Sequence, residues 1–256
     1  MRAILTVLGS GTSMGVPTIG CSCQVCISAD PHDRRTRPSV LIEYNDHVVM
    51  IDTTPDFREQ AIREKLTRLD AILYTHGHAD HVLGLDDVRP LSFRHASRIP
   101  LYADDPTARV LERMFEYIFN PTYEYGSLAR VEMNRLNGPV ELFGAVFRPV
   151  QVLHGKNPIQ GYRFGSAAYL TDFSSIPEES MRELRDLDLL FLDALRHKPH
   201  PTHSTLEDSL RIVKELKPKR AFFTHMSHDL GHAETNARLP DDVRLSYDGL
   251  KLEFEI

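Results

Sequence analysis

Three histidines and one aspartate fall within six consecutive positions, and this cluster restricts the fold more than any other feature. The residues are His76, His78, Asp80 and His81. They follow residues 71–74, an apolar run that predicts a buried strand. Imidazoles and carboxylates bind zinc, manganese and iron, so this density favours a metal site over a solvated polar turn. Because side chains alternate along a strand, a strand would turn His81 away from the others, and we expect residues 75–81 to form a loop.

Three more potential ligands also follow predicted strands. His154, Asp172 and His225 come at the ends of residues 146–153, 167–171 and 220–224. Parallel strands end at a common edge of a sheet, so one rim can collect all of these side chains. The alternative for Asp172 and His154 is a local role in the turns that follow them.

All three cysteines of the chain lie close together. They are Cys21, Cys23 and Cys26. An odd, clustered set in a cytosolic chain favours metal ligation over disulfides, and three free thiols in a loop are the alternative.

Length and charge restrict the class of protein. The 256 residues are enough for one large domain, and no linker marks a second, so we expect a single domain spanning 1–256. The net charge of −6 gives no general attraction to nucleic acid or anionic lipid. The first apolar run, residues 3–8, is too short for a signal peptide, and no segment is long enough to span a membrane. We therefore expect a cytoplasmic protein without a membrane partner.

Several local patterns predict the elements around these residues. Asp52 ends the second strand of a hairpin that turns at residues 45–46, and it could either cap a turn or orient a ligand imidazole. Residues 57–66 predict a short amphipathic helix. A second helix begins at a capping-box pattern, residues 204–207 (STLE), and ends before Pro218.

The predicted rim carries further candidates. His203 is favoured over His200 as a general acid or as a contact for developing negative charge. Residues 112–139 form either an ordinary helical connection or a lid over the site. Basic residues near the rim could meet a second phosphate, although solvated charges are the simpler interpretation: Lys156, Arg196 and Lys198.

The histidine cluster and the strand-end ligands together resemble the metallo-β-lactamase superfamily over nearly the whole chain. The resemblance implies an α/β (α+β) fold, the four-layer αββα metallo-β-lactamase sandwich, with a two-metal site at one edge. It implies that one metal is held by His76, His78 and His154, the other by Asp80, His81 and His225, and both by a bridging Asp172. The superfamily hosts many reactions, so the fold alone does not select one.

Further features resemble the phosphoribosyl 1,2-cyclic phosphate phosphodiesterase (PhnP-like) family of the carbon–phosphorus lyase pathway. They are the cysteine loop 20–27 with His228, the segments 9–13 (GSGTS) and 52–58 (DTTPDFR), and His203, 22 positions before His225. The resemblance implies two divalent active-site cations, Mn²⁺ or Zn²⁺, and catalytic roles for His203 and Asp80. It also implies one structural Zn²⁺, held by Cys21, Cys23, Cys26 and His228.

We therefore expect a two-metal-dependent phosphodiesterase that hydrolyses a small cyclic phosphodiester, such as 5-phospho-α-D-ribosyl 1,2-cyclic phosphate, to a phosphomonoester. One alternative is a transfer-RNA 3′-end-processing nuclease, but the sequence lacks the long basic arm of that family, and the acidic charge balance disfavours nucleic acid. Thioesterase or lactonase chemistry stays open, whereas the complete ligand set disfavours a non-enzymatic metal-binding module. The expected partner is a small phosphodiester substrate, and a homodimer is left open.

Overall fold

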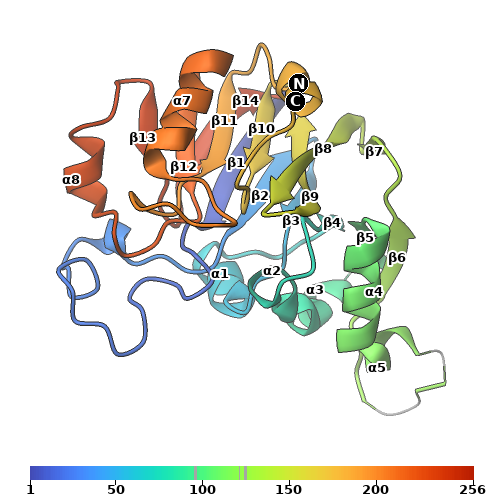
Figure 1. Ribbon diagram of the computed structural model, residues 1–256. Helices are drawn as coiled ribbons and strands as arrows, with labels where there is room; N and C mark the ends of the chain where they lie inside the picture. Colours follow the sequence, from blue (N-terminus) through green and yellow to red (C-terminus); the bar gives the residue numbers. More distant parts are fainter. Residues whose placement is uncertain (95–96, 121, 124–125) are drawn as a thin grey trace.

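Two seven-stranded β-sheets pack face to face, and helices lie along the outer face of each sheet (Figure 1). The computed structural model describes residues 1–94, 97–120, 122–123 and 126–256. This four-layer αββα arrangement confirms the predicted fold class. Within the described ranges, no helix is both long enough and apolar enough to cross a membrane.

The first sheet has an antiparallel half and a parallel half. The strands from β14 to β3 pair antiparallel, and those from β3 to β6 pair parallel. In sheet order they are β14 (Lys251–Glu255), β1 (Arg2–Gly9), β2 (Ser39–Tyr44), β3 (His47–Ile51), β4 (Ala71–Leu73), β5 (Ile99–Ala103) and β6 (Val131–Arg135). The central parallel strand β4 is wholly buried, as expected for a strand that is covered on both faces.

The second sheet mirrors the first. The strands from β13 to β10 pair parallel, and those from β10 to β7 pair antiparallel. In sheet order they are β13 (Val243–Leu245), β12 (Arg220–Thr224), β11 (Leu189–Asp193), β10 (Ala167–Leu170), β9 (Asn157–Phe164), β8 (Ala145–His154) and β7 (Val140–Leu142).

Three separate apolar clusters hold the four layers together. The cluster between the sheets includes Phe147, Phe164 and Phe191, and each of the other two lies between a sheet and its helices. The helices on the first sheet are α1 (Phe57–Arg63), α2 (Ala79–Val82), α3 (Arg89–Ser92), α4 (Asp105–Met114) and α5 (Glu116–Phe119). Those on the second are α6 (Glu178–Glu183), α7 (Leu206–Leu216) and α8 (His232–Asn236), and short 3₁₀ turns occupy Pro31–Asp33 and Leu83–Val88.

Left-handed backbone follows three strands at one edge of the sandwich. Asp52 after β3, Asp172 after β10 and His225 after β12 have φ values of 65°, 60° and 58°. Asp and His enter this region more readily than most residues, but it is unusual for any side chain other than glycine. The turn ends each strand abruptly and leaves a polar side chain at the shared edge.

The local predictions were largely correct, with two corrections. The hairpin turns at Asn45 and Asp46, as predicted. Residues 75–81 are not loop throughout, because α2 begins at Ala79 and takes in Asp80 and His81. The second error is the cap of α7, which is Thr205 and not Ser204: the Thr205 side chain accepts a hydrogen bond from the backbone N–H of Asp208, one position later than predicted.

The structure also places most of residues 112–139. They contain the end of α4, all of α5, and the edge strand β6, which pairs with β5. Residues 121 and 124–125, within the lid considered above, lie outside the described residues.

Candidate metal centre

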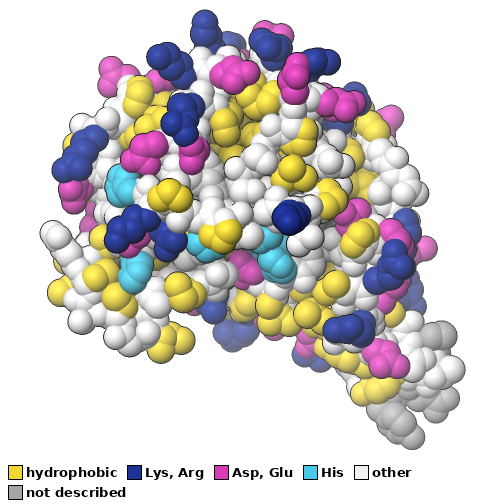
Figure 2. Space-filling model, in the orientation of Figure 1, with side chains coloured by type: hydrophobic (Ala, Val, Ile, Leu, Met, Phe, Trp, Pro, Cys, Tyr) yellow, Lys and Arg dark blue, Asp and Glu magenta, His cyan; other side chains and the backbone are white. Residues whose placement is uncertain are grey.

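All of the predicted active-site ligands come to one edge of the sandwich. The loop after β4 supplies His76 and His78, and the first turn of α2 supplies Asp80 and His81. The second sheet supplies His154 from the last position of β8, Asp172 after β10, and His225 after β12. On the face shown in Figure 2, histidine side chains reach the surface near the centre, beside hydrophobic ones.

One half of the cluster consists of three imidazoles. The ring centroids of His76 and His78 are 4.5 Å apart, and those of His78 and His154 are 5.1 Å apart. The third distance, from His76 to His154, is 5.7 Å. This is the set that the superfamily resemblance assigned to the first metal.

The other half contains two imidazoles and two carboxylates. Ligand atoms of Asp80, His81, Asp172 and His225 lie within 4.8 Å of one another. Asp172 is central, because its carboxylate oxygens lie 3.2 Å from Nε2 of His81 and 3.0 Å from Nε2 of His225. It also lies 4.0 Å from Nε2 of His76, so one carboxylate faces both halves.

Several ring nitrogens in this cluster have no hydrogen-bond partner. Nε2 of His76, His81 and His225 is buried and unsatisfied among the described residues. Buried polar atoms are normally paired, and metal binding is one of the few explanations for a group of exceptions. These nitrogens and the carboxylates of Asp80 and Asp172 converge on shared space, and their chemistry suits divalent cations. The residues therefore fit the metal site that the fold implies.

Hydrogen bonds to the outer nitrogens fix the orientation of two of these rings. Nδ1 of His81 lies 2.7 Å from Oδ2 of Asp52, and the backbone N–H and hydroxyl of Thr75 donate to the same carboxylate. Nδ1 of His154 lies 2.6 Å from the carbonyl oxygen of Asp172. In both cases Nε2 is left for a ligand. Of the two interpretations of Asp52, orientation of an imidazole is the one observed.

Burial and charge act differently on the imidazoles. Burial lowers the pKa of His76, with a further contribution from His81, and burial followed by His154 lowers the pKa of His78. Burial also opposes the charged form of His225, but the carboxylate of Asp172 outweighs it and raises the pKa to about 10. The pKa of His81 rises for the same reason. Without metal, the neighbouring carboxylates therefore favour the protonated forms of His81 and His225.

His203 lies at the rim beside both halves. Its ring stacks on that of His225, with centroids 4.7 Å apart and an interplanar angle of 11°, and is 4.8 Å from the ring of His154. Nδ1 of His203 lies 2.8 Å from Oδ2 of Asp193, the buried last residue of β11. His200 is one step further out, 5.0 Å from the ring of His203.

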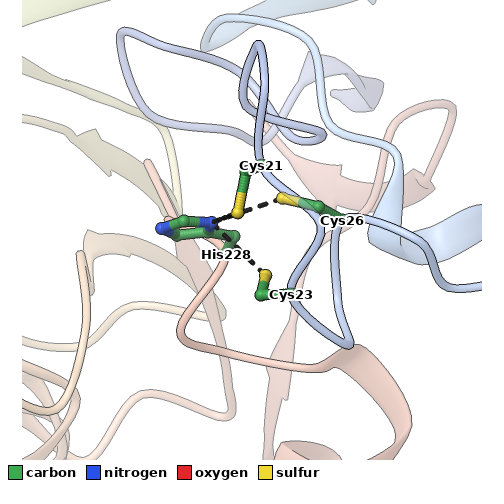
Figure 3. Close-up of side chains that lie close together, drawn as sticks. All are labelled: Cys21, Cys23, Cys26 and His228. Carbon is green, nitrogen blue, oxygen red and sulfur yellow. Dashed lines mark hydrogen bonds between the residues drawn. The ribbon is translucent and has the colours of Figure 1, made fainter.

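The cysteine loop forms a separate group. The Sγ atoms of Cys21, Cys23 and Cys26 lie 3.3, 3.5 and 3.3 Å from Nδ1 of His228 (Figure 3). Three sulfur atoms around one imidazole nitrogen match the donor set of a closed tetrahedral site, so this group could hold a structural metal. It ties the early loop to the segment that follows β12.

A buried arginine strengthens that connection. The guanidinium of Arg35 is fully buried, donates to the carbonyl oxygens of Ser227 and Leu230, and pairs with Asp33. Met226, between His225 and His228, exchanges backbone hydrogen bonds with the glycine-containing loop that follows β1. A Cβ on Gly11 would lie 2.7 Å from the carbonyl oxygen of Arg35, so this glycine permits close packing of backbones.

Sequence reasoning missed Asp193 and Arg35. Asp193 could have been found from the sequence, because it is a carboxylate at the end of an apolar strand, as Asp52 is. Arg35 could not have been found in this way, because its partners are mostly backbone carbonyl groups, which are present in every residue. Of the basic residues considered near the rim, Arg196 donates hydrogen bonds to the carbonyl oxygens of Lys198 and Pro199.

The known proteins that are similar to the chain agree with this geometry. Residues 47–226 match the β-lactamase superfamily domain. The chain belongs to the metallo-β-lactamase superfamily. A crystal structure described as a new diphosphatase from the PhnP family is 64% identical, with a TM-score of 0.94, and the match covers 99% of this chain and 98% of that one. The predicted resemblance is thereby confirmed: the chain belongs to the PhnP family, and its buried His/Asp cluster could hold metal ions.

Two more distant relatives broaden the comparison. An octanoyltransferase from Porphyromonas gingivalis is 38% identical over 256 residues, which cover 98% of this chain and 51% of the relative. The chain therefore spans about half the length of that protein. Zn²⁺-bound PqqB from Methylobacterium extorquens is 19% identical, with a TM-score of 0.76, over 97% of this chain and 99% of that one, and this likeness concerns the fold alone.

The contact between Asp52 and His81 leads to the first prediction. Replacing Asp52 by Asn preserves the size of the side chain but removes the charge that orients His81. We expect metal affinity to fall by about 10- to 100-fold, the usual cost of losing such a partner. Competition with a chelator measures the affinity. Asp46→Asn, in the exposed hairpin turn, is the matched control, and an unchanged affinity in Asp52→Asn would show that His81 orients without this contact.

The raised pKa values of His81 and His225 lead to the second prediction. A metal binds neutral imidazole, so it competes with the protonation of these rings that the carboxylates favour. Falling pH strengthens the competing proton, and the apparent affinity should drop by up to about tenfold per pH unit for each proton released. Calorimetric titration of metal-free protein in buffers of different ionisation enthalpy counts those protons. A binding enthalpy that is independent of the buffer would contradict the assignment.

Proposed function

We propose that the chain is a two-metal phosphohydrolase, and that the bond it cleaves is the diphosphate linkage of a small anionic substrate. The observation that carries this proposal is the 64% identity, over 99% of the chain, to a diphosphatase of the PhnP family. The metal centre supports it, because phosphoryl chemistry needs positive charge where negative charge develops. The overall charge of −6 supports a small substrate in preference to nucleic acid.

We propose two divalent cations, Mn²⁺ or Zn²⁺, at the active site and one structural Zn²⁺ in the cysteine group. The first would be held by His76, His78 and His154, the second by Asp80, His81 and His225, with Asp172 contacting both. When bound, the pair would supply Lewis-acid chemistry, lowering the pKa of a water molecule and neutralising phosphate charge.

The protein's own groups would then position and move protons. Asp172, 2% exposed and between the two halves, keeps both sets of ligands in register. Asp80 is the more accessible carboxylate, and its position beside His81 and His225 suits it to accept a proton from the attacking water. Asp193 engages Nδ1 of His203, which leaves Nε2 to donate a hydrogen bond or a proton to the departing oxygen once an anionic substrate favours the protonated ring.

A cyclic phosphodiester such as 5-phospho-α-D-ribosyl 1,2-cyclic phosphate is the second candidate substrate. The grouping of the three cysteines with His228, and the position of His203 at the rim, favour it because both features resemble that phosphodiesterase family. The two reactions share an in-line attack on phosphorus but differ in their products. A diphosphate gives two phosphate-bearing fragments, whereas a cyclic diester opens to one.

Phosphorus NMR of metal-reconstituted protein separates the candidates. The panel contains ADP-ribose, inorganic diphosphate, the ribosyl cyclic phosphate, bis(4-nitrophenyl) phosphate and a precursor transfer RNA, and an octanoyl thioester is assayed in parallel because one relative is an octanoyltransferase. We expect the fastest turnover with a diphosphate. Faster opening of the cyclic phosphate would move the assignment to the second candidate. Cleavage of the thioester or of RNA alone would overturn both.

The contact between His203 and Asp193 predicts a selective loss of turnover. His203→Ala should reduce kcat by about 10²- to 10⁴-fold, the usual contribution of a general acid, with metal content unchanged. Asp193→Asn should show a smaller loss of the same kind, because it weakens the hold on Nδ1. Metal content is measured by elemental analysis beside kcat. His200→Ala is the control, and equal loss of metal and activity in His203→Ala would make His203 a ligand.

A further inference from the structure

A cavity of about 290 Å³ opens directly beside the metal centre. It lies between the first half of α4 and the start of β9, and the imidazoles of the three-histidine half form one end of it. Its size is near the lower end of the range for small-molecule sites, so it can take one compact group. The lining residues are His76, Gly77, His78, Asp104, Pro106, Thr107, Val110, His154, Asn157, Pro158 and Ile159.

Two apolar walls define the shape of this cavity. Pro106 and Val110 come from α4, and Pro158 and Ile159 come from β9. Val110 is also packed against the metal-binding loop, because a Cβ on Gly77 would lie 3.0 Å from Val110. The α4 wall is therefore fixed relative to His76 and His78, and a group in the cavity would have a defined distance to the metal centre.

The charges around the cavity disfavour an anion. No lysine or arginine lines it, and of its lining residues, all within the described chain, only Asp104 is a carboxylate. The amino end of α4 would otherwise attract a phosphate. That end is already capped, since the Asp104 side chain accepts a hydrogen bond from the backbone N–H of Thr107. A second phosphate placed here would face the carboxylate of Asp104 and would have no lysine or arginine to pair with.

We propose that this cavity is a specificity site for an uncharged, flat ring attached to the phosphate that reacts at the metal centre. The inference rests on the proposed function, and it restricts the substrate class to phosphate compounds with a neutral ring next to the reacting phosphorus. Apolar walls on two sides favour a flat group, and Asp104 selects against a charged one. Val110 sets the depth of the cavity, and Asp104 sets its charge preference.

Binding of three matched probes to the metal-loaded protein tests this. Phenyl phosphate adds a neutral ring to methyl phosphate, and 4-carboxyphenyl phosphate adds a negative charge to that ring. By calorimetry, we expect phenyl phosphate to bind roughly tenfold more tightly than methyl phosphate, because the ring buries apolar surface. The carboxylated ring should lose roughly three- to tenfold of that gain through repulsion by Asp104.

Variants connect the preference to the named residues. Val110→Phe fills the cavity and should abolish the preference for phenyl over methyl phosphate, and Val110→Ala, which removes wall contacts without crowding, should reduce it by roughly threefold. Asp104→Asn retains a capping side chain and should restore binding of the carboxylated probe. Arg113→Ala, an exposed position of α4 outside the lining, is the control. Metal content is checked for each variant.

The outcomes separate this inference from the proposed function. A wild-type protein that binds both probes equally, or a Val110→Phe variant that retains the preference, would overturn the ring site even if diphosphates are hydrolysed. Conversely, a clear ring preference that Val110→Phe removes would support the site even if no substrate of the panel turns over. In that case only the proposed reaction would fail.

Discussion

A carboxylate that is removed from water costs several kcal/mol unless opposite charges or hydrogen-bond donors surround it, and Asp172 is 2% exposed. Imidazoles of His81 and His225 supply part of that compensation, and bound cations would supply the rest. The requirement ties the two sheets together, because His81 comes from the first sheet and both Asp172 and His225 come from the second. The contacts of Asp172 thus connect the two sheets as well as forming part of the candidate metal centre.

Left-handed backbone turns make this connection between the sheets possible. Asp52, Asp172 and His225 each leave their strand at a positive φ, so the apolar strand ends abruptly and the next side chain is polar. Apolar packing between the sheets and against the helices supplies the free energy that such conformations require. The apolar core therefore keeps the ligands in position, and the contacts between the ligands stabilise the edge of the core.

The sequence predicted the fold class through its resemblance to the metallo-β-lactamase superfamily, and it predicted the converging ligands through local information. Runs of apolar residues predict strands, and ligand residue types directly after them predict a shared rim. Contacts between residues that only the tertiary structure brings together were not predictable in this way. The contact of Asp193 with His203 requires the loop between β11 and α7 to return to its own strand, and Arg35 binds carbonyl oxygens. The cavity beside the candidate metal centre combines α4 and β9, which lie far apart in the chain. The cap of α7 was misplaced by one position because Ser204 and Thr205 are both good capping residues.

The short segment after β12 contributes His225 to the candidate metal centre and His228 to the cysteine group. Arg35 donates a hydrogen bond to the carbonyl oxygen of Ser227 in this segment. Disturbance of the cysteine loop would therefore affect the position of His225, because only Met226 and Ser227 separate it from His228. Substitution of Cys21, Cys23, Cys26 or Arg35 would therefore loosen the backbone segment that positions His225. These four positions lie far from the histidine motif in the sequence, although they support the same set of ligands.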